Sequence, residues 1–137
     1  MSIIEIVIAT AMISMAVIAA LSLTSKSQSQ NVYSRQSAEA SKYATQIIDW
    51  VRSERNLKGW ATINAKAAGT YCLNTIPSDF TTLSPGACLA STYISNTIFT
   101  RTMIITKDAG KIIISVEITW DERMPRSTII NLELTQW

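Results

Sequence analysis

An uncharged stretch close to the N-terminus constrains this chain more than any other feature. It runs from Ile6 to Ser25 and directly follows Glu5, the only charged side chain among the first 25 residues. At about 1.5 Å per residue the stretch would form a helix roughly 30 Å long, which is the hydrocarbon thickness of a bilayer. We therefore expect a helix that can span a membrane.

The carboxylate of Glu5 has two interpretations. An acid in the first turn of a helix is favoured by the helix dipole. A charge at the start of an apolar segment is also costly to bury, and it is usually retained to meet a positive partner. The residue alone leaves both interpretations open.

The composition of the chain excludes several classes of function. With 137 residues, the chain has room for one globular domain once the apolar stretch is set aside. The formal net charge of +2 is too small to indicate a specific nucleic-acid site. The chain has no histidine, and it shows no phosphate-binding loop or metal-ligand spacing. We therefore expect no enzyme, no cofactor and no metal site.

A single long helix is predicted for the first part of the chain. Between Ser2 and Lys58 there is no glycine or proline, and Gly59 is a typical C-terminal cap. After residue 25 the pattern becomes amphipathic, and three acid–base pairs indicate a solvated opposite face. The apolar stripe comprises Ala40, Tyr43, Ala44, Ile47, Ile48 and Val51, and the pairs are Glu39/Lys42, Asp49/Arg52 and Glu54/Lys58.

Residues 59–96 are predicted to be a connecting region with short elements. This region contains both cysteines of the chain, Cys72 and Cys88. If it is extracytoplasmic, the two form a disulfide that stabilises the fold by about 3 kcal/mol; the alternative is two buried free thiols.

Residues 97–137 are predicted to form an antiparallel sheet. Three runs have strand composition, namely Thr97–Lys107, Lys111–Trp120 and Thr128–Gln136. Asp108-Ala109-Gly110 predicts a three-residue hairpin, and Asp121–Ser127 predicts the second turn. The apolar face of the sheet is the expected partner of the helical stripe. The fold class is therefore α+β, with a long N-terminal helix packed on three or four antiparallel strands.

The N-terminus, Met1-Ser2-Ile3-Ile4-Glu5 followed by Ile6-Val7-Ile8-Ala9, resembles the mature N-terminus of type IV pilins and pseudopilins. In that family an apolar helix carries glutamate at its fifth position. The resemblance is specific for residues 1–25 and extends in architecture to a globular head over residues 26–137. Many pilins have a glycine and a proline in this helix, where this chain has Ser14 and Ser22. The usual family disulfide also encloses a more C-terminal loop.

The resemblance implies a structural subunit that polymerises into a surface pilus with roles in adhesion, twitching motility or DNA uptake. It implies that a prepilin peptidase removes a leader and methylates Met1, and that Glu5 pairs with the α-amino group of Met1 of a neighbouring subunit. Met is less common than Phe at this position, and Met1 is either a processed end or a translation start. The helical side chains expected to pack in the filament core are Ile3, Ile4, Ile6, Val7, Ile8, Met12, Ile13, Met15, Val17, Ile18 and Leu21.

The implied partners are identical subunits in a helical homopolymer, the pilus assembly machinery and, before assembly, the cytoplasmic membrane in a single-pass orientation. Two alternatives remain. One is a type II secretion pseudopilin or a minor pilin, although such pseudopilins often bind calcium through an acidic C-terminal loop and Leu132–Trp137 holds only Glu133. The other is a single-pass membrane protein with an extracellular binding domain that never polymerises.

Overall fold

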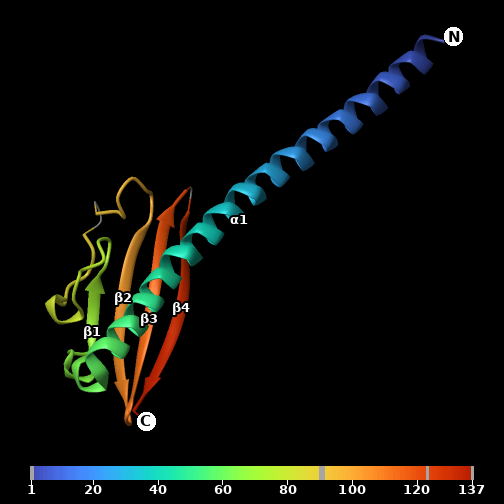
Figure 1. Ribbon diagram of the computed structural model, residues 1–137. Coiled ribbons are helices and arrows are strands. Elements are labelled where there is room, and N and C mark those ends of the chain that lie inside the picture. The colour runs from blue at the N-terminus through green and yellow to red at the C-terminus, as the bar shows by residue number, and fades with distance from the viewer. Residues whose placement is uncertain (1, 90–91, 123, 137) are drawn as a thin grey trace. The chain divides into compact units, whose positions relative to one another are not determined.

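The computed structural model describes residues 2–89, 92–122 and 124–136 of the chain. It forms two compact units, residues 1–36 and residues 37–137. One helix, α1 (Ile3–Ala65), begins in the first unit and continues in the second (Figure 1). The predicted α+β fold class is confirmed.

The second unit contains one antiparallel sheet with the strand order β1-β2-β3-β4. Figure 1 shows the second half of α1 lying across this sheet. The sheet has four strands because part of the predicted connecting region, Gly69–Cys72, pairs with the next strand. The strands are β1 (Gly69–Cys72), β2 (Thr100–Asp108), β3 (Lys111–Asp121) and β4 (Pro125–Thr135), and a short 3-10 helix spans Phe80–Thr82.

The predicted helical stripe and the apolar sheet face form a single core. Ala40, Ala44, Ile47 and Val51 of α1 are fully buried. On the sheet the alternate residues of β3 turn inward, as their period of two predicts. These inward residues are Ile112, Ile114, Val116, Ile118 and Trp120, joined by Met103, Ile105, Leu132 and Leu134 from the neighbouring strands.

The predicted end of the helix at Lys58 is wrong. Gly59 does leave the helical region, with φ 78° and ψ 170°, but the chain turns helical again and α1 ends at Ala65. Burial explains the extra turn, because Ile63 has no exposed surface and belongs to the core. Glycine is needed at this break, since side-chain-bearing residues rarely adopt such a backbone conformation.

Both predicted turns of the sheet are shorter in the structure. Asp108 pairs with Lys111, so the first turn has two residues, with positive φ at Ala109 and Gly110. Strand β4 begins at Pro125, which pairs with Asp121, rather than after Ser127. Proline is tolerated there because the first residue of an edge strand need not donate to the ladder.

The first predicted strand begins later than expected. Residues before Thr100 form a tight turn, in which the Thr97 N–H donates to the Ile94 carbonyl at 3.0 Å and the Ile94 N–H donates to the Phe99 carbonyl at 2.8 Å. Asn96 has a positive φ of 58° in this turn. Asparagine tolerates this region better than most residues, but no proline or glycine marks the turn in the sequence.

Candidate functional site

Glu5 lies in the first turn of α1, and its side chain is exposed. Its backbone N–H donates to the Ser2 carbonyl at 3.0 Å, and this hydrogen bond closes the turn at which the helix begins. Its predicted partner, Met1, lies outside the described residues. Within residues 2–36 no other acidic or basic side chain precedes Lys26, so the carboxylate stands by itself on an apolar helix.

The side chains predicted to form a filament core are all exposed in the first unit. Their exposed fractions run from 84% at Ile3 to 51% at Ile8 and Val17. Such a continuous apolar surface is not stable in water, and it indicates a membrane or a protein partner. Among the described residues α1 is the only helix that is long and apolar enough to cross a membrane.

In the part of α1 that precedes Lys26, four hydroxyl groups bond to the helix's own backbone. Thr10 Oγ1 donates to the Val7 carbonyl at 3.0 Å, and Ser14 Oγ donates to the Thr10 carbonyl at 2.7 Å. Further along the helix, Ser22 and Thr24 make the same kind of bond at 2.9 and 3.0 Å. Hydroxyls satisfied in this way are tolerated in an apolar environment, and the helix is unbroken across Ser14–Leu23.

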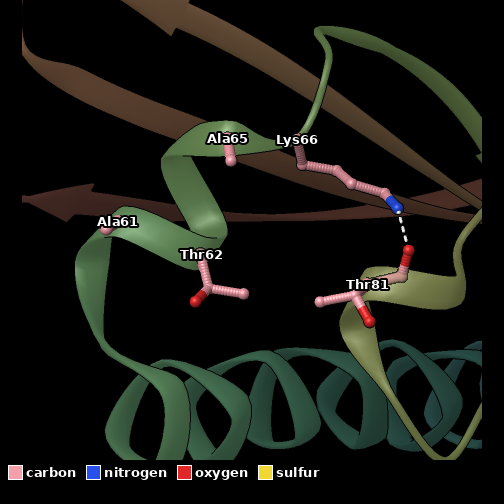
Figure 2. A pocket seen from close by; sticks show the side chains of 5 residues that line it. All are labelled: Ala61, Thr62, Ala65, Lys66 and Thr81. Atoms are coloured by element: carbon pink, nitrogen blue, oxygen red, sulfur yellow. Dashed lines mark hydrogen bonds between the residues drawn. The ribbon is translucent and has the colours of Figure 1, made fainter.

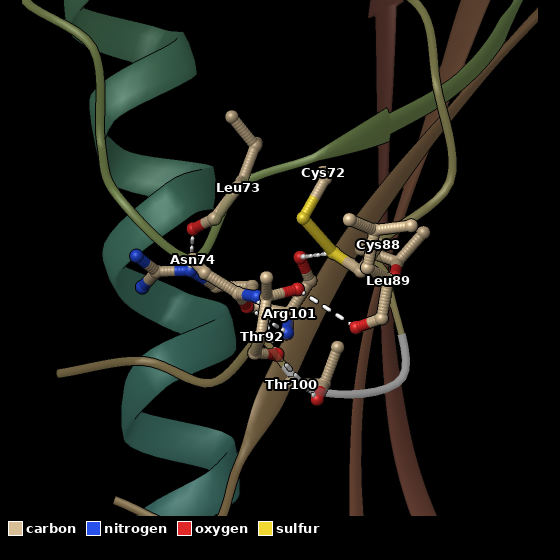
Figure 3. The surroundings of a disulfide bond; sticks show 9 residues. Cys72, Leu73, Asn74, Cys88, Leu89, Thr92, Thr100 and Arg101 are labelled. Atoms are coloured by element: carbon tan, nitrogen blue, oxygen red, sulfur yellow. Dashed lines mark hydrogen bonds between the residues drawn. A yellow bond between two sulfur atoms is a disulfide. The ribbon is translucent and has the colours of Figure 1, made fainter. Parts of the chain in front are cut away.

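The predicted disulfide between Cys72 and Cys88 is confirmed (Figure 3). It joins the end of β1 to the connecting region. Both cysteines are half-buried in the second unit. The bond closes the segment that carries the 3-10 helix, and this segment packs on α1.

A charged cluster attaches the same segment to α1. Lys58 contacts Glu54 at 3.2 Å and forms a second ion pair with Asp79. Hydrogen bonding to Lys58 and to the Thr81 backbone lowers the pKa of Asp79 to about 2. The hydrogen bond to Asp79 in turn raises the pKa of Lys58.

The prediction that Glu54 lies on a solvated face is wrong. Only 6% of the residue is exposed, and its Oε2 accepts the Phe80 N–H at 2.9 Å. The carboxylate therefore serves as the hydrogen-bond acceptor for the first N–H of the 3-10 helix. Asp49 and Arg52 do form the expected exposed pair, at 3.3 Å.

Arg101 is a buried cation that was not predicted from the sequence. It is 2% exposed, and burial lowers its pKa to about 10. Its Nε donates to the Leu73 carbonyl at 2.7 Å, and its Nη1 donates to the Tyr43 carbonyl of α1 at 3.2 Å. The one sequence signal is its position in the strand, because Arg101 is two residues from Met103 and alternate residues of a strand face the same side.

One hollow of the second unit lies between the end of α1 and the 3-10 helix. The hollow drawn in Figure 2 has a volume of about 500 Å³, and its lining residues include Ala61, Thr62 and Ala65. Among the described residues that line it, Lys66 is the only charged one, and its Nζ donates to the Thr81 carbonyl at 2.7 Å. No group of three or more metal-ligating side chains occurs in residues 2–89, 92–122 and 124–136. The absence of enzymatic activity stays a prediction.

No protein-family model matches the chain, and neither a curated protein nor a solved structure matches it. The long apolar N-terminal helix, the antiparallel sheet and the disulfide are compatible with a pilin-like fold.

Proposed function

We propose that this protein is the structural subunit of a type IV pilus, a helical homopolymer on the cell surface. The observation that carries the proposal is the solitary carboxylate of Glu5 at the head of an exposed apolar helix. The compatible fold of the second unit supports it. Adhesion, twitching motility and DNA uptake are the roles expected of such a fibre.

Two environments can remove the apolar surface of the helix from water. Before assembly the helix lies in the cytoplasmic membrane as a single span, and in the fibre it packs against the same helix of other subunits. Because lipid is as apolar as the helix, transfer between the two gains little from the hydrophobic effect. The register between helices must therefore come from close packing and from polar pairs.

Glu5 supplies such a polar pair. Its partner in this proposal is the α-amino group of Met1 on the adjoining subunit, exposed after a peptidase has removed a leader. A carboxylate that leaves water is strongly stabilised by an opposite charge. The contact joins two different surfaces, so it does not close on itself and instead repeats along a helical filament.

The direct test combines sheared surface material, electron microscopy and the intact mass of the subunit. We expect fibres whose subunit begins at Met1 and carries one methyl group. Fibres confined to the periplasm would instead indicate a pseudopilin. Solitary molecules that stay in the membrane fraction with an unmethylated Met1 would refute the proposal and indicate a non-polymerising membrane protein.

The role of Glu5 is tested by Glu5→Val and Glu5→Gln, with Glu39→Gln as a matched control. Glu39 is an exposed acid on the same helix, so its replacement removes one charge without touching the N-terminus. We expect both Glu5 variants to reach the membrane and fail to enter fibres, whereas the control assembles normally. If Glu5→Val assembles as efficiently as the wild type, the carboxylate serves only the helix dipole, which is worth about 0.3–1 kcal/mol.

A further inference from the structure

A second hollow of the globular unit lies beside the disulfide, on the sheet face opposite α1. Its volume is about 390 Å³, which lies within the range of small-ligand pockets. Strands β2, β3 and β4 and the connecting region all contribute to its lining. Nothing in the proposed pilus function uses it.

The rim of the hollow exposes three large apolar side chains. Leu89 is 72% exposed, Tyr93 is 53% exposed and Ile98 is 45% exposed. Clustered exposed apolar groups with a polar surround are typical of binding sites. Trp120 also lines the hollow but is 3% exposed and packs on Phe99 at a ring-centroid distance of 5.7 Å. Among the described residues of the lining, Tyr93 is therefore the exposed aromatic side chain.

Several polar side chains of the hollow can accept hydrogen bonds, and the hydroxyls of Thr119 and Tyr93, which also line it, can donate or accept. Thr100 Oγ1 already donates to the Thr92 carbonyl at 3.1 Å, so only its lone pairs are left for a ligand (Figure 3). Thr102 Oγ1 donates weakly to Cys88 Sγ at 3.7 Å, and the carboxylate of Asp121 accepts only. A matching ligand therefore brings several hydrogen-bond donors and also has acceptors, as hydroxyl groups do.

The charge of the lining limits the class of ligand further. Among the described residues of the lining, Asp121 is the only charged one and there is no lysine or arginine. An anionic ligand is disfavoured by this carboxylate. A quaternary ammonium would leave the threonine hydroxyls unused, and one open ring makes no aromatic cage. A neutral ligand with many hydroxyls and an apolar face satisfies all of these groups.

Several described parts of the hollow's wall are held by covalent or hydrogen bonds. The disulfide fixes Cys88, and the Thr92 carbonyl accepts the Asn74 side-chain amide at 2.8 Å. The hydrogen-bonded turn between Ile94 and Phe99 holds the segment that follows Tyr93. A site arranged in advance loses less conformational entropy on binding.

We propose that this hollow binds a neutral saccharide, with Tyr93 stacked on the apolar face of one pyranose ring and Asp121 accepting hydrogen bonds from its hydroxyl groups. The inference goes beyond the proposed function, because a single solubilised subunit is sufficient for binding. A fibre built from such subunits would present the site many times along its length, and multivalency would raise a weak affinity for a glycan-coated surface.

The test uses the full chain in a polyoxyethylene ether detergent, which carries neither a sugar nor a charge. Saturation-transfer-difference NMR is recorded with methyl galactoside, methyl mannoside, N-acetylglucosamine and lactose as neutral probes. N-acetylneuraminic acid and choline serve as the anionic and cationic probes. We expect millimolar binding of at least one neutral sugar and none of the charged probes.

Variants locate the binding. Tyr93→Ala is expected to weaken it by about tenfold, and Asp121→Asn is expected to weaken it less. Tyr33→Ala, at a tyrosine of the first unit that is 42% exposed, is the matched control. Both replaced tyrosines are exposed, so unchanged thermal unfolding verifies the fold. The proposal is overturned if no neutral sugar binds, if Tyr93→Ala binds as the wild type does, or if a charged probe binds equally well.

Discussion

Replacing Ile114 by alanine is expected to destabilise the globular unit strongly, because this side chain lies in the middle of the helix–sheet core. Ile114 is fully buried and pairs with Ile105 on one side and Leu132 on the other, and both of these are also buried. The substitution removes three carbon atoms, which contribute about 2.4 kcal/mol of transfer free energy at roughly 0.8 kcal/mol per carbon. The cavity left behind brings the loss to about 3–4 kcal/mol.

The matched control is Ile129→Ala on the neighbouring strand. Ile129 has the same side chain but is 56% exposed, because it lies on the opposite face of the sheet. Its replacement is expected to change the free energy of unfolding by less than about 0.5 kcal/mol.

Thermal unfolding of the oxidised full chain in detergent, followed by near-UV circular dichroism, measures both variants. We expect Ile114→Ala to lower the midpoint by roughly 12–30 °C and the control to leave it within a few degrees. Equal losses in the two variants would refute the reasoning, because they would mean that the strand register does not place these residues on opposite faces.

Three further perturbations test the globular unit. Replacing Cys72 and Cys88 by serine is expected to lower the free energy of unfolding by about 3 kcal/mol, measured by urea denaturation; an unchanged midpoint would show that the bond constrains nothing. Gly59→Ala is expected to cost about 1–3 kcal/mol, because its φ of 78° and ψ of 170° suit glycine alone, whereas Gly86→Ala has open space and no positive φ and should be near neutral. Asp79, whose pKa is lowered from 3.8 to about 2, stabilises the fold fully above pH 4 and loses this contribution as the pH falls through 2. Asp79→Asn should therefore be less stable than the wild type at pH 6 and converge with it near pH 2, and a constant difference would contradict the ion pair.

Much of the fold follows from local patterns in the sequence. The apolar stripe from Ala40 to Val51 and the alternation from Ile112 to Trp120 each identified the buried face correctly, because periodicity reports which side of an element is apolar. The disulfide followed from the count and placement of two cysteines. The position of Glu5 followed from the sequence too, whereas its pairing with Met1 stays a prediction.

The ends of the helices and strands were harder to predict from the sequence. Gly59 was identified as a break, but the sequence did not show that Trp60 to Ala65 would turn helical again, since that turn depends on a core site for Ile63. Strand β1, within the predicted connecting region, was not predicted because it too depends on a distant part of the chain. A four-residue strand has little pattern of its own, and it is defined by its pairing with β2.

By itself the sequence determined the long apolar helix, the solitary charge at its start and the inward faces of the sheet, because these depend on residues that are neighbours along the chain. Only the tertiary structure decided which polar groups are buried. Glu54 receives a backbone N–H from 26 residues away, and Arg101 donates to a carbonyl 58 residues away. A charge can be buried only where such distant partners meet it, and no local pattern reports that they do.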